Sequence, residues 1–300
     1  MPQVCPICEG ANPATFARVA GYPYFCCQAC DSIFIDPEVL AQIDRDEFVR
    51  TYDQTYWVAE DESARERSFG PAIARVAELF LYARKPITRF IDIASGPGYL
   101  LDALSLYLPS SKGLFWGVER FPPSTYTSHP NYRIGSLEDL EGTFDAGVCI
   151  EVIEHLTPNM LRSLAVAMAT KSTPDSIFLV NTGMPPYVRN EDPGYLDPLV
   201  RGHIVSYGLR GVEHIFKPLG FDVIPLPGKD WAFLLEFLPT KRTPGTATDR
   251  IWTPHPSNRH IFHDAEMGSV LYCLGLDAAR AYGSANHHDG GATKWTAPLR

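Results

Sequence analysis

The sequence at residues 90–101 reads Phe90-Ile91-Asp92-Ile93-Ala94-Ser95-Gly96-Pro97-Gly98-Tyr99-Leu100-Leu101. Its first four residues form an apolar run of strand length, the next five form a turn of small residues, and an apolar-periodic helix follows. Glycine lets the backbone approach a ligand closely, and a helix N-terminus presents N–H groups without partners. The order of strand, glycine turn and helix therefore predicts a nucleotide-cofactor site.

An acidic residue ends the next apolar run, which is Leu114-Phe115-Trp116-Gly117-Val118 followed by Glu119. A carboxylate at the tip of the second strand can accept hydrogen bonds from both hydroxyls of a ribose. A dinucleotide site would need a third glycine three residues after Gly98, where this chain has Leu101. The pattern disfavours NAD and favours a nucleoside cofactor that has no phosphate.

Two segments resemble class I S-adenosylmethionine-dependent methyltransferases. Residues 91–98 are similar to the first motif of that family, and Phe144-Asp145-Ala146-Gly147-Val148-Cys149-Ile150-Glu151-Val152-Ile153-Glu154-His155-Leu156 is similar to its fourth-strand motif. The resemblance covers residues 90–237 and implies a Rossmann-like, doubly wound α/β sheet of seven strands, the last of them antiparallel. Ala94 and Ser136 depart from the family pattern, which usually has glycine and aspartate there.

The motifs and the resemblance together indicate the residues that bind S-adenosylmethionine. One of these residues, Tyr56, belongs to an aromatic group with Tyr52 and Trp57 on an expected helix. This group is expected either to pack on the main domain or to cover the cofactor. The expected cofactor-binding residues are Tyr56, Asp92, Ala94, Ser95, Gly96, Gly98, Tyr99, Glu119, Ser136, Leu137 and Glu151.

Cys5, Cys8, Cys27 and Cys30 form two Cys-x-x-Cys pairs that 18 residues separate. Two such pairs can deliver four thiolates to one tetrahedral zinc ion, which stabilises a segment too short for its own core. Four thiolates leave no open position, so this zinc would be structural. Cys26 is an ambiguous neighbour of the second pair, and free or redox cysteines are the alternative. The arrangement, with strands expected at 22–25 and 33–35, resembles small zinc ribbons that precede some bacterial methyltransferases.

The expected fourth strand, 146–150, delivers Glu151, Glu154 and His155 to the carboxyl edge of the sheet, where ligands bind. We predict His155 as a general base because histidine titrates near neutrality; a structural role in the loop is the alternative. Residues 183–203 form a long irregular loop, expected as a substrate lid rather than a simple surface loop. Its candidate residues are Tyr187, Arg189 and Tyr195 for substrate contacts and His203 as a second catalytic residue.

The remaining segments complete the expected domain plan. Ser206 is expected to cap a helix that Gly220 closes, and 221–224 and 231–237 are expected as the final antiparallel pair of strands. Residues 240–258 are expected as linker, 264–282 as one helix and 283–300 as tail. The predicted domains are a zinc ribbon at 1–40, a helical connector and cover at 41–85, a methyltransferase domain at 86–239, and a C-terminal extension and tail at 240–300.

Composition excludes several classes of protein. The chain has 300 residues, 45% of them hydrophobic, which is enough for a substantial core. A formal net charge of −9 disfavours a nucleic-acid partner, because phosphate contacts need clusters of lysine and arginine. No apolar run approaches the roughly 20 residues of a membrane span, and the N-terminal residues do not follow a secretory-signal pattern. We expect a cytoplasmic location.

The sequence thus predicts an enzyme that transfers a methyl group from S-adenosylmethionine to a small-molecule or carbohydrate-like acceptor. O-methylation is favoured, and C- or N-methylation would also fit. The expected cofactors are S-adenosylmethionine and a structural Zn²⁺. The competing functions are those of a ribosomal-RNA or tRNA base methyltransferase with a zinc finger, a non-catalytic protein that binds adenosylmethionine, and an NAD oxidoreductase.

Overall fold

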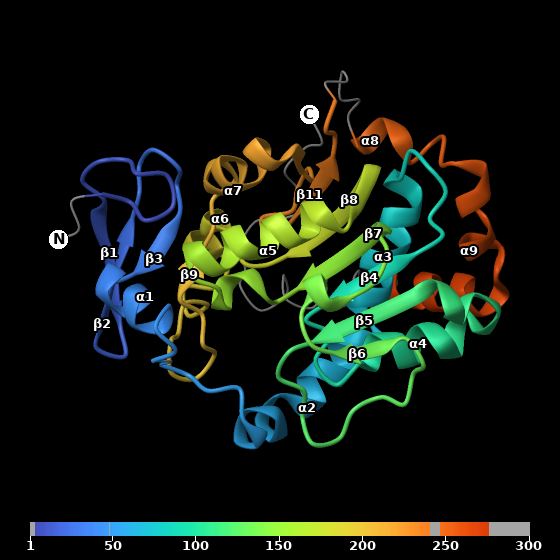
Figure 1. Cartoon of the computed structure of the whole chain (residues 1–300), viewed down its shortest axis with the longest axis horizontal. Coiled ribbons are helices and arrows are strands. Elements are labelled where there is room, and N and C mark those ends of the chain that lie inside the picture. Colours follow the sequence, from blue (N-terminus) through green and yellow to red (C-terminus); the bar gives the residue numbers. More distant parts are fainter. Residues whose placement is uncertain (1–3, 48, 241–246, 276–300) are drawn as a thin grey trace, which may run out of the picture.

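The computed structural model describes residues 4–47, 49–240 and 247–275. A seven-stranded sheet with helices on both faces forms the larger part of the molecule, and an N-terminal ribbon (residues 4–35) packs at one end of it (Figure 1). The strand order is β10-β11-β8-β7-β4-β5-β6. Only β11, the last strand of this sheet in the sequence, runs antiparallel to both of its neighbours. The predicted Rossmann-like doubly wound fold is therefore confirmed.

The central strands of this sheet are buried on both faces, which explains their continuous apolar sequences. In parallel register, Phe90 of β4 lies opposite Phe115 of β5 and Ala146 of β7. The carboxyl ends of these three strands therefore meet at one edge of the sheet. The strands are β4 (Phe90–Ile93), β5 (Phe115–Glu119), β6 (Tyr132–Ile134), β7 (Phe144–Ile150), β8 (Ser172–Asn181), β10 (Phe221–Pro225) and β11 (Ala232–Phe237).

The helices divide between the two faces of the sheet, because alternate strand residues point to opposite sides. Phe90 belongs to a core with α3 (Pro71–Tyr82) and α4 (Tyr99–Tyr107). Ile91 belongs to a core with α5 (Pro158–Thr170) and α7 (Leu209–Phe216). The short helix α6 (Pro185–Asn190) lies within the expected lid. Short 3-10 turns occur at Pro109–Leu114, Leu137–Asp139, Ile153–His155, Lys217–Leu219 and Pro256–Asn258.

The N-terminal ribbon is a four-stranded antiparallel sheet with the order β1-β2-β3-β9. Its strands are β1 (Ala14–Val19), β2 (Tyr22–Cys26), β3 (Ile33–Ile35) and β9 (Val205–Ser206). The strands expected at 22–25 and 33–35 are confirmed, whereas β1 and β9 were not predicted. Strand β9 comes from the end of the expected lid, with Val205 opposite Phe34. The ribbon and the main sheet are thereby joined through one shared core, in which Phe34 and Val205 are both fully buried.

The prediction that Ser206 caps α7 is wrong, because Ser206 belongs to β9 and its Oγ donates to the Gly183 carbonyl at 2.7 Å. The N-cap of α7 is Gly208. Gly220 closes the following 3-10 turn with φ of 91°, as predicted. Pairing with the ribbon therefore removes Ser206 from the helix that its sequence position suggests.

The connector between ribbon and sheet contains α1 (Pro37–Ile43) and α2 (Gln54–Phe69). Asp53 caps α2, since its side chain accepts hydrogen bonds from the backbone N–H groups of Thr55 and Tyr56. Tyr52 consequently lies before the helix rather than on it. Helix α2 runs beside α4, and the Tyr99 hydroxyl donates to Asp61 at 2.6 Å, so α2 is attached close to the glycine turn.

The described part of the expected linker, 247–258, packs on the main sheet instead of forming a free connection. The Arg250 guanidinium donates to both carboxylate oxygens of Glu236 at 2.7 and 2.8 Å, and Glu236 is fully buried in β11. Asn258 accepts from the Ile87 N–H at 2.9 Å. These side chains fasten α8 (Ala247–Arg250) and α9 (His260–His263) against the sheet, so this segment contributes to the fold.

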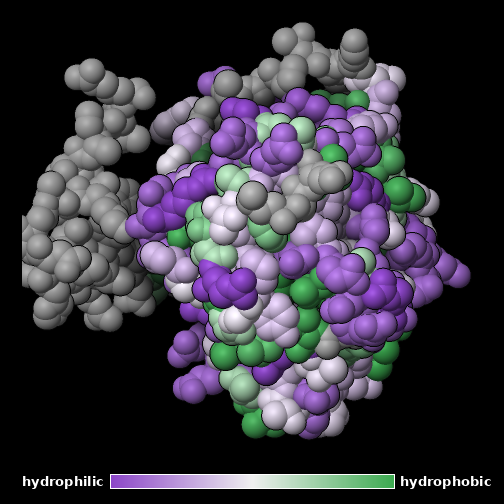
Figure 2. All heavy atoms as spheres, turned by 90° about the vertical axis from the view of Figure 1, so that its left-hand side faces the viewer, coloured by the Kyte–Doolittle hydropathy of each residue, from purple (hydrophilic) through white to green (hydrophobic). Residues whose placement is uncertain are grey.

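Beyond α9, residues 265–275 are helical, in agreement with the expected helix; its remainder to 282 and the expected tail lie outside the described residues. None of the helices in the described ranges combines the length and the apolar character needed to cross a bilayer. On the face at the ribbon end, hydrophobic residues appear as small groups separated by hydrophilic ones (Figure 2). Most apolar residues of the ribbon are buried in the core that it shares with the main sheet.

Candidate cofactor and acceptor site

The turn after β4 is built from left-handed backbone conformations. Ala94, Gly96 and Gly98 have φ of 57°, 53° and 81°. A Cβ on Gly98 would lie 2.2 Å from Thr127 Cγ2, so only glycine fits there. Ala94 adopts a conformation that costs an alanine about 1 kcal/mol or more, so glycine would be less strained at this position. The turn leaves backbone N–H groups at the N-terminus of α4, at the carboxyl edge of the sheet.

Glu119 is held against this turn. Its Oε2 accepts from the Gly96 N–H at 2.9 Å, its Oε1 accepts from the Phe121 N–H at 2.7 Å, and its side chain is buried. Burial raises the pKa of Glu119. Each carboxylate oxygen retains capacity for a further hydrogen bond, which is what a ribose diol requires.

Asp92 holds the turn through a hydrogen bond from Ser95. It is buried at the centre of β4 and accepts from the Ser95 hydroxyl at 2.6 Å. Burial raises the pKa of Asp92 to about 7. Asp92 and Ser95, which the sequence predicted as cofactor-binding residues, thus act together to fix the turn.

An aromatic group covers the turn. The Trp57 ring lies over Gly96, where an added Cβ would approach it to 3.1 Å, and its Nε1 donates to the Phe121 carbonyl at 2.9 Å. Tyr56 makes edge contacts with Trp57 and with Tyr52, at centroid distances of 5.2 and 4.9 Å. Tyr52 also contacts Phe121 and His155. The sequence singled out Tyr52, Tyr56 and Trp57, but it gave no signal for Phe121.

Ser136 and Leu137 follow β6. Leu137 is buried, and Ser136 forms a capping box with Asp139, in which the Ser136 N–H donates to the Asp139 carboxylate at 2.8 Å. Ser136 also lines a cavity of about 500 Å³ together with Trp116 and Arg133. Val118, the residue before Glu119, lines this cavity as well.

Residues that follow β7 and residues of the expected lid form one group, which we call the edge cluster: Glu151, Glu154, His155, Tyr195 and His203. Glu154, Tyr195 and His203 are buried, whereas Glu151 and His155 are half-buried. Glu154 is fully buried and its Oε1 accepts from the Tyr195 hydroxyl at 2.9 Å. Glu151, with φ of 54°, accepts from the Asn181 amide at 2.6 Å. Asn181 was not predicted, although its position at the end of β8 places it at the same edge.

The two histidines of the edge cluster have the same tautomer, because each Nδ1 faces a backbone carbonyl, which can only accept. His155 Nδ1 lies 3.1 Å from the Gly202 oxygen, and His203 Nδ1 lies 2.7 Å from the Tyr195 oxygen. Both Nε2 atoms therefore carry lone pairs. The ring centroids are 4.8 Å apart, so the fold unites the two predicted catalytic histidines.

The expected lid contributes unequally to this site. Tyr195 and His203 are buried in the edge cluster, and Tyr187 makes an edge contact with Tyr195 at 5.6 Å. Arg189 is placed elsewhere, because its guanidinium pairs with Asp31 of the ribbon at 2.7 Å and donates to Cys26 Sγ at 3.1 Å. Arg189 is thus part of the contact between α6 and the ribbon, and the expected substrate contact is not supported for it.

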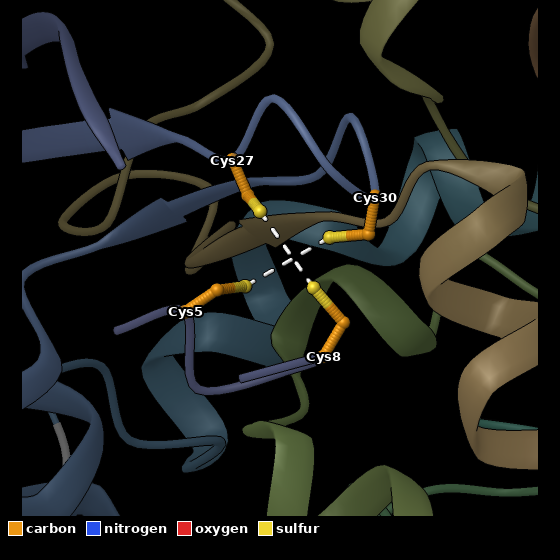
Figure 3. A group of neighbouring side chains, drawn as sticks. All are labelled: Cys5, Cys8, Cys27 and Cys30. Atoms are coloured by element: carbon orange, nitrogen blue, oxygen red, sulfur yellow. Dashed lines mark hydrogen bonds between the residues drawn. The ribbon is translucent and has the colours of Figure 1, made fainter. Parts of the chain in front are cut away.

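The four cysteines of the ribbon point toward one centre (Figure 3). Cys5 Sγ and Cys30 Sγ are 3.8 Å apart, and Cys8 Sγ and Cys27 Sγ are 3.6 Å apart. A tetrahedron with zinc–sulfur bonds of about 2.3 Å has edges of about 3.8 Å, so the arrangement fits a zinc ion. Cys26 lies outside this set. The fold thus selects among the five candidate thiols.

Comparison with known proteins gives structural similarity only. No family model and no curated protein matches the chain. An O-methyltransferase family protein from Burkholderia thailandensis has 16% identity over 67% of this chain and 70% of its own, with a TM-score of 0.48. The 1,6-didemethyltoxoflavin-N1-methyltransferase of the same organism has 16% identity over 75% and 97%, with a TM-score of 0.45. CalS10, an amino pentose methyltransferase from Micromonospora echinaspora, has 16% identity over 63% and 98%, with a TM-score of 0.42. At these values, function has to be inferred from the site itself.

Proposed function

We propose that this protein is an S-adenosylmethionine-dependent methyltransferase. The observation that carries the proposal is the position of Glu119, whose carboxylate is held by the Gly96 and Phe121 N–H groups at the carboxyl edge of β4 and β5. This geometry suits the diol of a ribose. Gly96 and Gly98 in the turn beside it have no side chains, so a ligand can approach the backbone there closely. Leu101 occupies the position at which a pyrophosphate-binding turn would have its third glycine, so a dinucleotide is disfavoured.

The cofactor supplies a methyl group that its sulfonium already activates, so the protein's contribution is binding, alignment and exclusion of water. Glu119 and the Gly96–Gly98 turn bind the nucleoside, and Tyr99 lies at the first position of α4 beside them. Tyr56 and Trp57 of α2 cover the turn and exclude water from it. The Nε2 atoms of His155 and His203 carry lone pairs, and we propose that one of them receives the hydroxyl proton of the acceptor.

The acceptor we propose is a small or carbohydrate-like molecule that is methylated on oxygen, with carbon and nitrogen as alternatives. Residues 183–203 contribute Tyr195 and His203 to the edge cluster, and Tyr187 of the same segment packs against Tyr195 at a centroid distance of 5.6 Å, so this segment encloses one side of the cluster. Enclosure of this kind suits a compact acceptor. The formal net charge of −9 opposes a nucleic-acid acceptor.

The zinc ion that we propose for Cys5, Cys8, Cys27 and Cys30 has a structural role, because four thiolates complete its coordination. The ribbon that it stabilises reaches the site directly. The Tyr24 hydroxyl donates to the His203 carbonyl at 2.8 Å, and the Ile35 N–H donates to the Ile204 carbonyl at 2.9 Å. Zinc thereby fixes the backbone that carries His203.

Calorimetry with S-adenosylmethionine, S-adenosylhomocysteine and NAD⁺ tests the cofactor assignment. We expect both sulfur nucleosides to bind and NAD⁺ not to bind. Glu119→Gln should weaken nucleoside binding at least about tenfold, because hydrogen bonds to a charged carboxylate contribute about 1.5–3 kcal/mol each. Glu138→Gln, which removes an exposed carboxylate in the next loop, is the matched control and should leave affinity unchanged. Equal affinity in both variants, or binding of NAD⁺ alone, would refute the proposal.

A further inference from the structure

Three potential ligand atoms converge within the edge cluster. Glu154, His155 and His203 each offer one oxygen or nitrogen atom, and these atoms all lie within 4.8 Å of one another. His203 Nε2 is 3.9 Å from Glu154 Oε1. Donors that share one metal ion at bonds of about 2.1 Å are roughly 3–4 Å apart, so small side-chain rotations suffice to bring these three onto a common ion.

The orientation of both imidazoles suits ligation. A metal-binding histidine commonly donates its other ring N–H to a carbonyl or carboxylate, which fixes the tautomer and aims the free nitrogen. His155 and His203 each do this through Nδ1, to the carbonyl oxygens of Gly202 and Tyr195. Each Nε2 is left as an unprotonated, directed donor.

Glu154 supplies an independent observation. The residue has 0% exposure, yet its Oε2 has no hydrogen-bond partner. Among the residues that the structure describes, no lysine or arginine forms an ion pair with Glu154, and its only ion-pair contact is with His203. A buried, half-satisfied carboxylate costs several kcal/mol unless a cation or proton compensates it. A second carboxylate, Glu151, lies in the same cluster and increases the need for a positive charge.

We propose that Glu154, His155 and His203 bind one divalent transition-metal ion at the acceptor end of the site. Two imidazoles and a carboxylate are ligands that Mn²⁺, Fe²⁺, Co²⁺ and Zn²⁺ accept, and three protein ligands leave coordination positions open. Tyr52 contacts both His155 and Phe121, and the Phe121 N–H holds Glu119, so the proposed ion and cofactor positions are connected through Tyr52.

This inference rests on the proposed function and makes it more specific, because the open positions would receive an acceptor oxygen. Coordination lowers the pKa of a bound hydroxyl. Its O–H bond breaks and the proton passes to water, the new O–CH₃ bond forms as the S–CH₃ bond breaks, and S-adenosylhomocysteine leaves. The metal then replaces the histidine base of the proposed function: the two histidines act as ligands, and the acceptor class is a hydroxyl compound.

Titration of the full chain with Mn²⁺, after its cysteine site has been filled with zinc, tests the site without any turnover. The electron paramagnetic resonance signal of free Mn²⁺ falls when the ion binds, and Mn²⁺ disfavours thiolate ligands, so the ribbon does not interfere. We expect one Mn²⁺ per chain. Glu154→Gln and His203→Ala should weaken binding at least tenfold. His214→Ala, which removes an exposed histidine on α7, is the matched control and should bind as the wild type does.

Glu154→Gln keeps the shape of the side chain and an acceptor for Tyr195, and circular dichroism checks that it folds. The inference is overturned if neither Mn²⁺ nor Co²⁺ binds beyond the ribbon, or if folded Glu154→Gln binds Mn²⁺ as tightly as the wild type does. Calorimetry with S-adenosylhomocysteine on the same samples separates the two proposals. Nucleoside binding without metal binding refutes the metal site alone, whereas metal binding without nucleoside binding refutes the proposed methyltransferase function and leaves the ion site standing.

Discussion

Removing one hydroxyl from the ribbon should disturb the candidate site, which that hydroxyl contacts directly. Tyr24 is fully buried in β2, and its hydroxyl donates to the His203 carbonyl at 2.8 Å. Tyr24→Phe deletes only this donor and leaves the ring. The carbonyl then lacks its partner in a buried position, which costs about 1–3 kcal/mol. For a protein of this size, 1 kcal/mol corresponds to about 2–4 °C, so the melting temperature should fall by about 2–12 °C.

Thermal unfolding of the zinc-loaded protein measures the stability loss, and nitrogen-15 NMR of the histidine side chains reports on His203. We expect the His203 resonances to shift and broaden in Tyr24→Phe. Tyr22→Phe is the matched control, because Tyr22 is in the same strand and half-buried, and its hydroxyl has no hydrogen bond within the described structure. If both variants melt together and the His203 signals do not change, the ribbon does not position that histidine.

Two further predictions concern the glycine turn. Ala94→Gly should raise the free energy of unfolding by up to about 1 kcal/mol in urea titrations. The reason is that the backbone strain of an alanine at φ of 57° is larger than the conformational-entropy cost of a glycine. A lower free energy of unfolding in the variant would show that Ala94 is not strained. Asp92 has a folded-state pKa of about 7, raised by burial above its unfolded value of 3.8, so its contribution to stability is present below pH 4 and is lost as the pH rises to 7. Asp92→Asn has no carboxyl group to titrate, so its free energy of unfolding, measured in urea between pH 4 and 8, should change less with pH than that of the wild type. If the two proteins show the same pH dependence, the raised pKa of Asp92 is refuted.

The main sheet could be predicted because each strand carries its own signal. The run from Phe90 to Ile93 is apolar and ends at a turn of small residues, and Tyr132–Ile134 is bounded by polar loop on both sides. Two motifs at the ends of strands then placed Glu119 and the edge cluster on one side of the sheet. Local patterns of this kind require no knowledge of distant residues.

The features that could not be predicted depend on partners far away in the chain. Val205 and Ser206 form a strand only because the edge of β3 is free to pair with them. Arg189 looked like a substrate contact until the fold brought Asp31 to it. The polar segment that includes Arg250 resembled a linker, because nothing near it in the sequence shows that Glu236 lies buried opposite. The charge of a loop side chain indicates the sign of its partner, but nothing in the local sequence shows where that partner lies.

The pairing of β3 with β9 also constrains the order in which the protein can mature on the ribosome. The four cysteines that we propose as zinc ligands are translated before the main sheet, but Val205 and Ser206 are synthesised about 170 residues later than the strand that they complete. Until then β3 presents an open edge, which is a surface prone to wrong pairing between nascent chains. The last element of the ribbon therefore closes only after most of the main sheet has been translated, and the ribbon and the site that it supports reach their final form together.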